Sequence, residues 1–131
     1  MSLQLISATL DDYVIDQYPD KNMINLADAT FTEPTGDYRE WIQCRFNPIK
    51  RKTIGLNGTT RGRVEEVGEY KVTCFSTYRK TALKLADDIT EMLDCKELDN
   101  NIRLELGIPH PPEDLDGKIW ACSLSFLVRR S

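Results

Sequence analysis

The sequence lacks several features that mark membrane, secreted and metal-binding proteins. No apolar run approaches the roughly 18 residues that a membrane-spanning helix requires. The N-terminal stretch has no basic region, and Asp11 and Asp12 follow soon after it, so we expect no signal peptide. There are four cysteines with no CxxC pair and a single histidine, His110. Zinc sites use closely paired Cys or His ligands, so the sequence predicts reduced cysteines packed as small apolar side chains, with no metal and no cofactor.

Residues typical of an active site are also sparse. His110 lies between prolines in a predicted loop, with no nucleophile beside it. Residues 114–117 match only part of a calcium-loop pattern, and we interpret them as a turn. Gly55, Gly58 and Gly62 lack the spacing of a phosphate-binding loop, and no helix begins directly after them. The sequence therefore predicts that the chain is not an enzyme, while a small α+β enzyme stays open as an alternative.

What is present indicates one globular unit spanning residues 1–131. The chain is 40% hydrophobic and 29% charged, which favours a folded domain over disorder. Its net charge of −4 argues against a protein dedicated to coating DNA or RNA, because such proteins are usually basic.

Hydrophobic periodicity predicts two helices and four main strands. Apolar residues recur every three or four positions from Leu3 to Val14, and Pro19 ends that helix. A second apolar stripe runs from Ala82 to Leu93, with Ser76 or Thr77 as its cap. Strict alternation marks the strands, at about 39–47, 63–76, 102–108 and 120–128. We expect an α+β fold of order α-β-β-α-β-β, in which an antiparallel sheet carries both helices on one face.

The connection between the first two strands is unusually long. Pro48 is expected to stop the first strand, and a glycine-punctuated hairpin loop then spans residues 48–62. Irregular apolar spacing around Val67 and Gly68 predicts a β-bulge in the second strand.

Charge is distributed unevenly along the chain. Residues 45–63 contain six basic and no acidic side chains, whereas residues 83–116 contain ten acidic and three basic ones. Three interpretations are open: two solvated surfaces, phosphate contact by the basic loop, or a head-to-tail contact between copies of the chain. A head-to-tail contact closes into a ring when the rotation between neighbours allows it.

Two segments carry a resemblance to a known family. One is Trp41-Ile42-Gln43-Cys44-Arg45-Phe46, and the other is residues 61–93, which include Val67-Gly68-Glu69-Tyr70-Lys71-Val72 and Ala82-Leu83-Lys84-Leu85-Ala86-Asp87-Asp88. Over residues 39–94 the chain resembles the tail terminator (tail completion) proteins of long-tailed bacteriophages. It departs from them at Thr77-Tyr78-Arg79-Lys80, where those relatives commonly place a glycine before the helix.

The resemblance implies a structural virion protein in the tail neck, assembled in the host cytoplasm. It implies a hexameric ring on the head-proximal end of the tail tube, which stops tube polymerisation and presents a joining surface to the head-side connector or stopper protein. DNA would pass through the ring without sequence-specific binding, and no membrane would be involved. A head–tail adaptor, a tail-tube subunit and a nucleic-acid-binding module remain alternatives.

The ring implied by the resemblance and the uneven charge along the chain together predict which residues join neighbouring copies. We expect basic residues of one copy to meet acidic residues on the second helix of the next copy. The basic set is Lys50, Arg51, Lys52, Arg61 and Arg63, and the acidic set is Asp87, Asp88 and Glu91.

Overall fold

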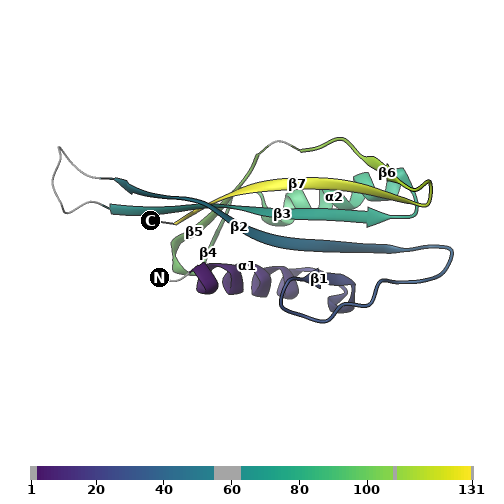
Figure 1. Ribbon diagram of the computed structural model, residues 1–131, viewed down its shortest axis with the longest axis horizontal. Coiled ribbons are helices and arrows are strands. Elements are labelled where there is room, and N and C mark those ends of the chain that lie inside the picture. The colour runs from purple at the N-terminus through teal and green to yellow at the C-terminus, as the bar shows by residue number, and fades with distance from the viewer. Residues whose placement is uncertain (1–2, 55–62, 108, 131) are drawn as a thin grey trace.

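The computed structural model describes residues 3–54, 63–107 and 109–130. Over these ranges the chain forms two α-helices, two short 3-10 helices and seven strands (Figure 1). The helices are α1 (Leu3–Gln17) and α2 (Arg79–Leu93), and the 3-10 turns are η1 (Lys21–Met23) and η2 (Asp99–Asn101). The strands are β1 (Ile24–Leu26), β2 (Glu40–Ile54), β3 (Arg63–Ser76), β4 (Lys96–Leu98), β5 (Ile102–Leu106), β6 (Glu113–Leu115) and β7 (Ile119–Arg130).

The strands form one sheet in the order β1-β2-β3-β7-β5-β4, and β6 pairs with β7. The predicted α+β class and the order of the main elements are confirmed. The sheet is mixed rather than wholly antiparallel, because β1 pairs parallel with residues 42–44 of β2. The three-residue strands β1, β4 and β6 were not predicted, since segments this short carry no clear alternation.

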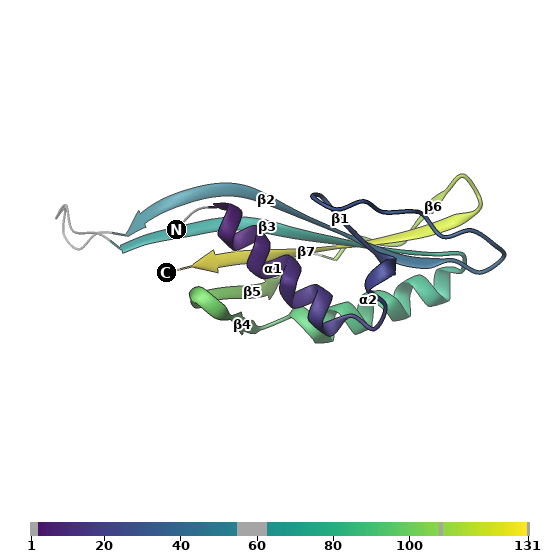
Figure 2. The same ribbon diagram turned by 90° about the horizontal axis from the view of Figure 1, so that it is seen from below.

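Both helices cover the same face of the sheet, as predicted (Figure 2). Alternate residues of β2, β3, β5 and β7 point to this face, and Tyr70 and Phe126 at its centre are fully buried. The helices contribute Ile6, Leu10 and Val14 from α1 and Ala82, Leu85, Ala86, Ile89 and Leu93 from α2. Each fully buried side chain of Leu or Ile size contributes about 1.5–3 kcal/mol, so this shared core stabilises the sheet and both helices together.

The start of α2 differs from the prediction. The N-cap residue is Tyr78, and its side chain makes no capping hydrogen bond. The Thr77 hydroxyl instead accepts a hydrogen bond of 2.8 Å from the Arg39 backbone N–H. Ser76 accepts one of 3.4 Å from the backbone N–H of Tyr78. These hydroxyls hold the start of β2 and the turn rather than the helix end, so the predicted cap was wrong.

Strand β2 continues past Pro48 to Ile54, so the prediction that Pro48 ends it was wrong. The β2–β3 pairing shifts register between Pro48 and Lys50, and this bulge accommodates a residue that has no backbone donor. The irregularity therefore lies on β2, opposite Gly68, rather than on β3. A Cβ at Gly68 would lie 2.5 Å from Cε1 of Phe46, so the absence of a side chain there lets the Phe46 ring lie against the Gly68 backbone.

The two longest strands extend beyond the rest of the sheet. The last residue of β7, Arg130, pairs with Glu66, whereas β2 and β3 go on pairing to Ile54 and Arg63. We call residues 50–54 of β2 and 63–67 of β3 the arm; it extends away from the helices in Figures 1 and 2. Of the predicted 48–62 loop, residues 48–54 are strand, and 55–62 lie outside the described residues.

The cysteines and the proline-rich connection mostly follow prediction. None of the four cysteines is in a disulfide, and Cys44, Cys74 and Cys122 are buried. Cys95 is exposed, in a turn with a positive φ of 58°, so the prediction that every thiol packs in the core was wrong there. Of the turn predicted at 114–117, Asp116 and Gly117 form a turn with positive φ, whereas residues 114 and 115 belong to β6. The exposed His110 anchors its segment through a backbone hydrogen bond of 3.0 Å to the Ser123 carbonyl.

Candidate interaction surface

A hollow of about 740 Å³ lies between the C-terminal part of α1 and α2. We call it the inter-helix hollow. Its apolar lining includes Met23, Leu85, Ile89 and Met92. Its four carboxylates come from three different places in the chain, and these are Asp20, Glu40 and, on α2, Asp88 and Glu91. Lys96 also lines it, so the hollow combines an apolar floor with a net negative rim.

A second hollow of about 520 Å³ lies on the other side of Tyr13, between α1 and β4. We call it the acidic hollow, because Asp12, Asp16, Glu97 and Asp99 line it and no basic side chain does so among the described residues. Tyr13 borders both hollows, and its hydroxyl donates a 3.2 Å hydrogen bond to the Met92 carbonyl at the end of α2. Tyr13 thereby fixes the distance between the helices on which both hollows depend.

The two hollows together make this side of the molecule strongly anionic. Among the residues that the structure describes, eight carboxylates line them and Lys96 is the one basic side chain in either lining. Over the described part of the chain, one salt bridge reaches these carboxylates, from Arg103 to Glu97 at 4.0 Å. Tyr18 is buried beside the inter-helix hollow, and burial raises its pKa above the usual range. The negative charges of Glu40 and Asp20 raise the pKa of Tyr18 further. A cationic partner is therefore the one that this surface attracts.

The sequence predicted only part of this surface. Asp88 and Glu91 do line the inter-helix hollow, as three-residue spacing on α2 allows. Asp87 does not line it; this residue lies on the Cys122 side of α2, where its charge adds to burial in raising the pKa of Cys122. The contribution of α1 was missed, although the four-residue spacing of Asp12 and Asp16 was a signal that both share a helix face.

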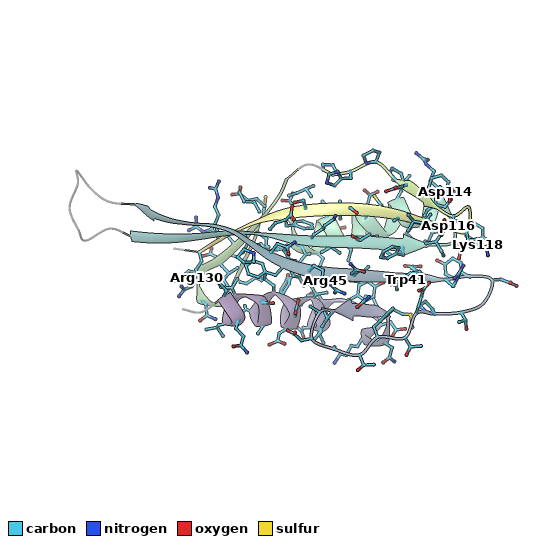
Figure 3. The ribbon with its side chains drawn as sticks, viewed as in Figure 1. Trp41, Arg45, Asp114, Asp116, Lys118 and Arg130 are labelled. Carbon is cyan, nitrogen blue, oxygen red and sulfur yellow. The ribbon has the colours of Figure 1, made fainter. Side chains whose placement is uncertain are left out.

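The predicted basic residues divide into three groups. The backbones of Lys50, Arg51, Lys52 and Arg63 belong to the arm, whereas Arg61 lies outside the described residues. Arg45, which belongs to the basic segment of the sequence, is used internally. Its guanidinium donates hydrogen bonds of 2.9 and 3.2 Å to the carbonyl and Oδ1 of Asn25 and so holds β1 against β2 (Figure 3).

Strand register refines the charge of the arm. Arg51 pairs with Glu66 and Lys52 pairs with Glu65, so acids that follow the basic segment in sequence lie across from it in the fold. The arm is therefore less strongly basic than residues 45–63 taken alone.

The helix-free face of the sheet has a hollow of its own, of about 560 Å³. Trp41 stacks on Phe75 there, with ring centroids 4.8 Å apart. Its charged lining is balanced, with Glu33 and Asp116 against Arg39 and Lys118. Asp116 and Lys118 lie at the same end of the sheet as Trp41 (Figure 3). This hollow has no dominant charge and therefore indicates no particular class of partner.

Two features bear on metals and membranes. Within residues 3–54, 63–107 and 109–130, no three His, Cys, Asp or Glu side chains are grouped so that they could hold a metal ion. Neither α1 nor α2 is long and apolar enough to cross a membrane, and the described part of the chain has no other α-helix.

Comparison with known proteins shows a likeness of fold. The chain is similar to one in the virion of a native gene transfer agent (GTA) particle, with a TM-score of 0.67, 11% identity, and coverage of 95% of this chain and 92% of that one. A second solved structure, of a protein described only by a sequence identifier, has a TM-score of 0.60 and 16% identity over 98% of this chain and 96% of that one. Both likenesses extend over nearly the whole of each chain and show a shared fold. No family model matches the sequence, and no curated protein matches it.

Proposed function

We propose that this chain is a structural virion protein that assembles as a ring on the head-proximal end of a phage tail tube. The observation that carries the proposal is the likeness of fold to a chain of a gene transfer agent virion, which spans nearly the whole of both chains. In this proposal the ring, a hexamer by resemblance to tail terminators, stops tube polymerisation and joins the tube to the head-side connector. DNA passes through its lumen without sequence-specific binding, and the protein has no catalytic role and no cofactor.

The charge layout supports assembly of the chain with itself. The arm and the anionic helix side lie on different parts of the molecule, so a contact between them joins unlike surfaces of two copies. Such a contact is heterologous and generates a ring when it closes. The candidate contact residues are Lys50, Arg51, Lys52, Arg61 and Arg63 on one copy and Asp87, Asp88 and Glu91 on the next. Exposed ion pairs contribute only about 0–1 kcal/mol each, so their effect depends on repetition around the ring.

Native mass spectrometry of the full chain, alone and mixed with tail tubes, tests this function directly. We expect closed oligomers of one stoichiometry, and electron microscopy of the mixture should show a cap on one end of each tube. Tubes capped in this way should not lengthen when free tube subunits are added.

Three results would replace the proposal. Polymerisation of the purified chain into tubes would identify a tail-tube subunit. Attachment to heads rather than tubes would identify a head–tail adaptor. A monomer that binds duplex DNA in a salt-dependent way, or that turns over a substrate and loses this on His110→Ala, would place it in another class.

A further inference from the structure

We propose that the inter-helix hollow is part of a groove that binds a basic amphipathic segment of a different protein. The apolar side of that segment lies on α2, and its Lys or Arg side chains lie at the acidic rim. The inference goes beyond the ring, because it concerns a surface that each copy offers to another protein. It assigns Asp88 and Glu91 to that partner, whereas Asp87 does not line the hollow and falls outside the site.

The groove follows one side of α2. Four of the α2 residues that line the hollow are three or four positions apart and so share a side of the helix, and these are Leu85, Asp88, Ile89 and Met92. Tyr78, the N-cap residue, precedes Leu85 by nearly two full turns and lies toward the same side. At a rise of 1.5 Å per residue, the stretch from Tyr78 to Met92 spans about 21 Å, which matches about four turns of a bound helix.

An exposed aromatic pair lies where α2 begins. The ring centroids of Tyr38 and Tyr78 are 6.1 Å apart, and these residues are 52% and 57% exposed. The Tyr38 hydroxyl donates a hydrogen bond to Glu40, which lines the hollow, so the pair adjoins one end of it. Tyrosine is enriched among the residues that dominate binding at interfaces, since it offers a large ring at a low cost in side-chain entropy. The pair therefore extends the apolar surface that a partner can cover.

The lining of the hollow can accept apolar side chains from a partner. Leu85 and Ile89 are buried, while Met23 and Met92 are half-buried and keep part of their surface open to contact. Methionine side chains are flexible and polarisable, so they adapt to apolar groups of different shape. The volume of about 740 Å³ lies within the range of pockets that enclose a ligand.

The rim indicates that the partner segment is basic. Among the described residues, the lining holds four carboxylates and one base, Lys96. The last turn of α2 contains no basic residue, so the negative end of the helix dipole adds to the field of Asp88 and Glu91. Lys or Arg side chains at the edges of a bound helix complement both sources of negative charge.

The overall charge of the chain favours a different protein over a second copy as the occupant. The chain has a net charge of −4, so another copy approaches the rim against an overall repulsion, whereas a basic partner is attracted from a distance. An amphipathic helix that lays its apolar side in such a groove is a common mode of peptide recognition.

Peptide binding to the full chain tests the inference. The probe is a fluorescent peptide of about 14 residues, made of Leu, Ala and Lys with Leu recurring every three or four positions. A second peptide has Glu in place of each Lys. By fluorescence anisotropy, we expect the Lys peptide to bind and the Glu peptide not to bind. Asp88→Lys/Glu91→Lys should raise the dissociation constant of the Lys peptide by about tenfold or more, and Tyr38→Ala/Tyr78→Ala by about threefold or more.

A matched control separates the groove from a general effect of charge. Glu105 and Glu113 are exposed and do not line the hollow, so Glu105→Lys/Glu113→Lys makes the same change in net charge outside the groove. This control should raise the dissociation constant far less than the groove reversal does. Asp88→Lys/Glu91→Lys places positive charge toward the negative end of α2, so the fold should not be weakened. Circular dichroism of each variant checks this.

The methionines report binding at the groove itself. The chain has three, and two of them, Met23 and Met92, line the hollow. In protein labelled with carbon-13 at the methionine methyl groups, the NMR signals of these two should shift as the Lys peptide is added. Met23→Leu and Met92→Leu assign the signals.

Each failure has a separate meaning. Equal effects of the two charge reversals, or unshifted signals of Met23 and Met92, would overturn the groove as a binding site. If Asp88→Lys/Glu91→Lys abolishes assembly of the chain with itself and the Lys peptide dissociates assembled copies, the occupant is a second copy and the inference is wrong. If the groove binds as expected but no ring forms on tail tubes, the proposed function fails while this inference stands.

Discussion

The Tyr70 hydroxyl donates a 2.7 Å hydrogen bond to Oδ1 of Asp11 and so joins the centre of the sheet to α1. Tyr70 is fully buried in β3, and Asp11 sits between the apolar face of α1 and its exposed side. The bond is a polar anchor in an otherwise apolar interface. Because α1 carries Asp12, Tyr13 and Asp16, the same anchor sets the position of the wall that the two hollows share.

Removal of the Tyr70 hydroxyl should loosen α1. We expect Tyr70→Phe to lower the free energy of unfolding by about 1–2 kcal/mol, because Asp11 keeps its desolvation cost and loses its donor. Urea denaturation at pH 7 measures this change. Tyr38→Phe is the matched control, since the Tyr38 hydroxyl also donates to a carboxylate, Glu40, but Tyr38 is exposed. Equal losses in the two variants would contradict a special role for the buried bond.

The same carboxyl should give stability a particular pH dependence. Burial raises the pKa of Asp11 more than its hydrogen bond to Tyr70 lowers it. The folded state therefore holds this proton more tightly than the unfolded state, and the contribution of Asp11 to stability falls as the pH rises from the usual carboxyl pKa of about 3.9 through the raised pKa.

Asp11→Asn isolates this effect, since its amide oxygen still accepts from Tyr70 and it does not ionise. Relative to the native chain, the variant should gain stability as the pH rises from 4 toward 7. Urea midpoints at a series of pH values measure the difference. Parallel curves for the two proteins would show that the Asp11 pKa is not raised by folding.

Gly68→Ala should destabilise the bulged region of the hairpin. The new Cβ would lie 2.5 Å from Cε1 of Phe46, closer than packed carbon atoms approach, so the ring must move. We expect a loss of about 1–3 kcal/mol in the free energy of unfolding, as for other overpacked sites. In a Phe46→Leu background, Gly68→Ala should lower the free energy of unfolding by less than it does in the native chain, because the smaller side chain leaves room for the new Cβ. Full additivity of the two changes would mean that the ring and the glycine do not interact.

Thiol labelling should distinguish one cysteine from the other three. Cys95 is exposed while Cys44, Cys74 and Cys122 are buried, so iodoacetamide should label one thiol in the native protein and four after unfolding. The hydrogen bond to Asp94 and the charge of that residue raise the pKa of Cys95, so labelling should be slow at pH 7 and speed up at alkaline pH. Cys95→Ser should abolish the native-state reaction, and rapid labelling of this variant would contradict the burial of the rest.

Local sequence predicted the elements because their signals are local. The three- and four-residue spacing of Ile6, Leu10 and Val14, with Pro19 beyond them, was enough to place α1. Strict alternation likewise placed β3 and β7 and showed which residues face the core. The capping of α2 and the end of β2 were mispredicted, because Thr77 bonds Arg39 across the sheet and Gly68 makes room opposite the bulge at Pro48.

The sequence alone thus determined the class of the fold, the apolar side of each helix and strand, and the contrast between a basic and an acidic segment. Only the tertiary structure decided how these charges are grouped. Packing brings Asp20 and Glu40 beside Asp88 and Glu91, and Asp12 and Asp16 beside Glu97 and Asp99. It also sets Glu65 and Glu66 across from Lys52 and Arg51. The physical reason is that spacing along the chain fixes which face of an element a residue occupies, whereas the neighbour of that face depends on how distant elements pack.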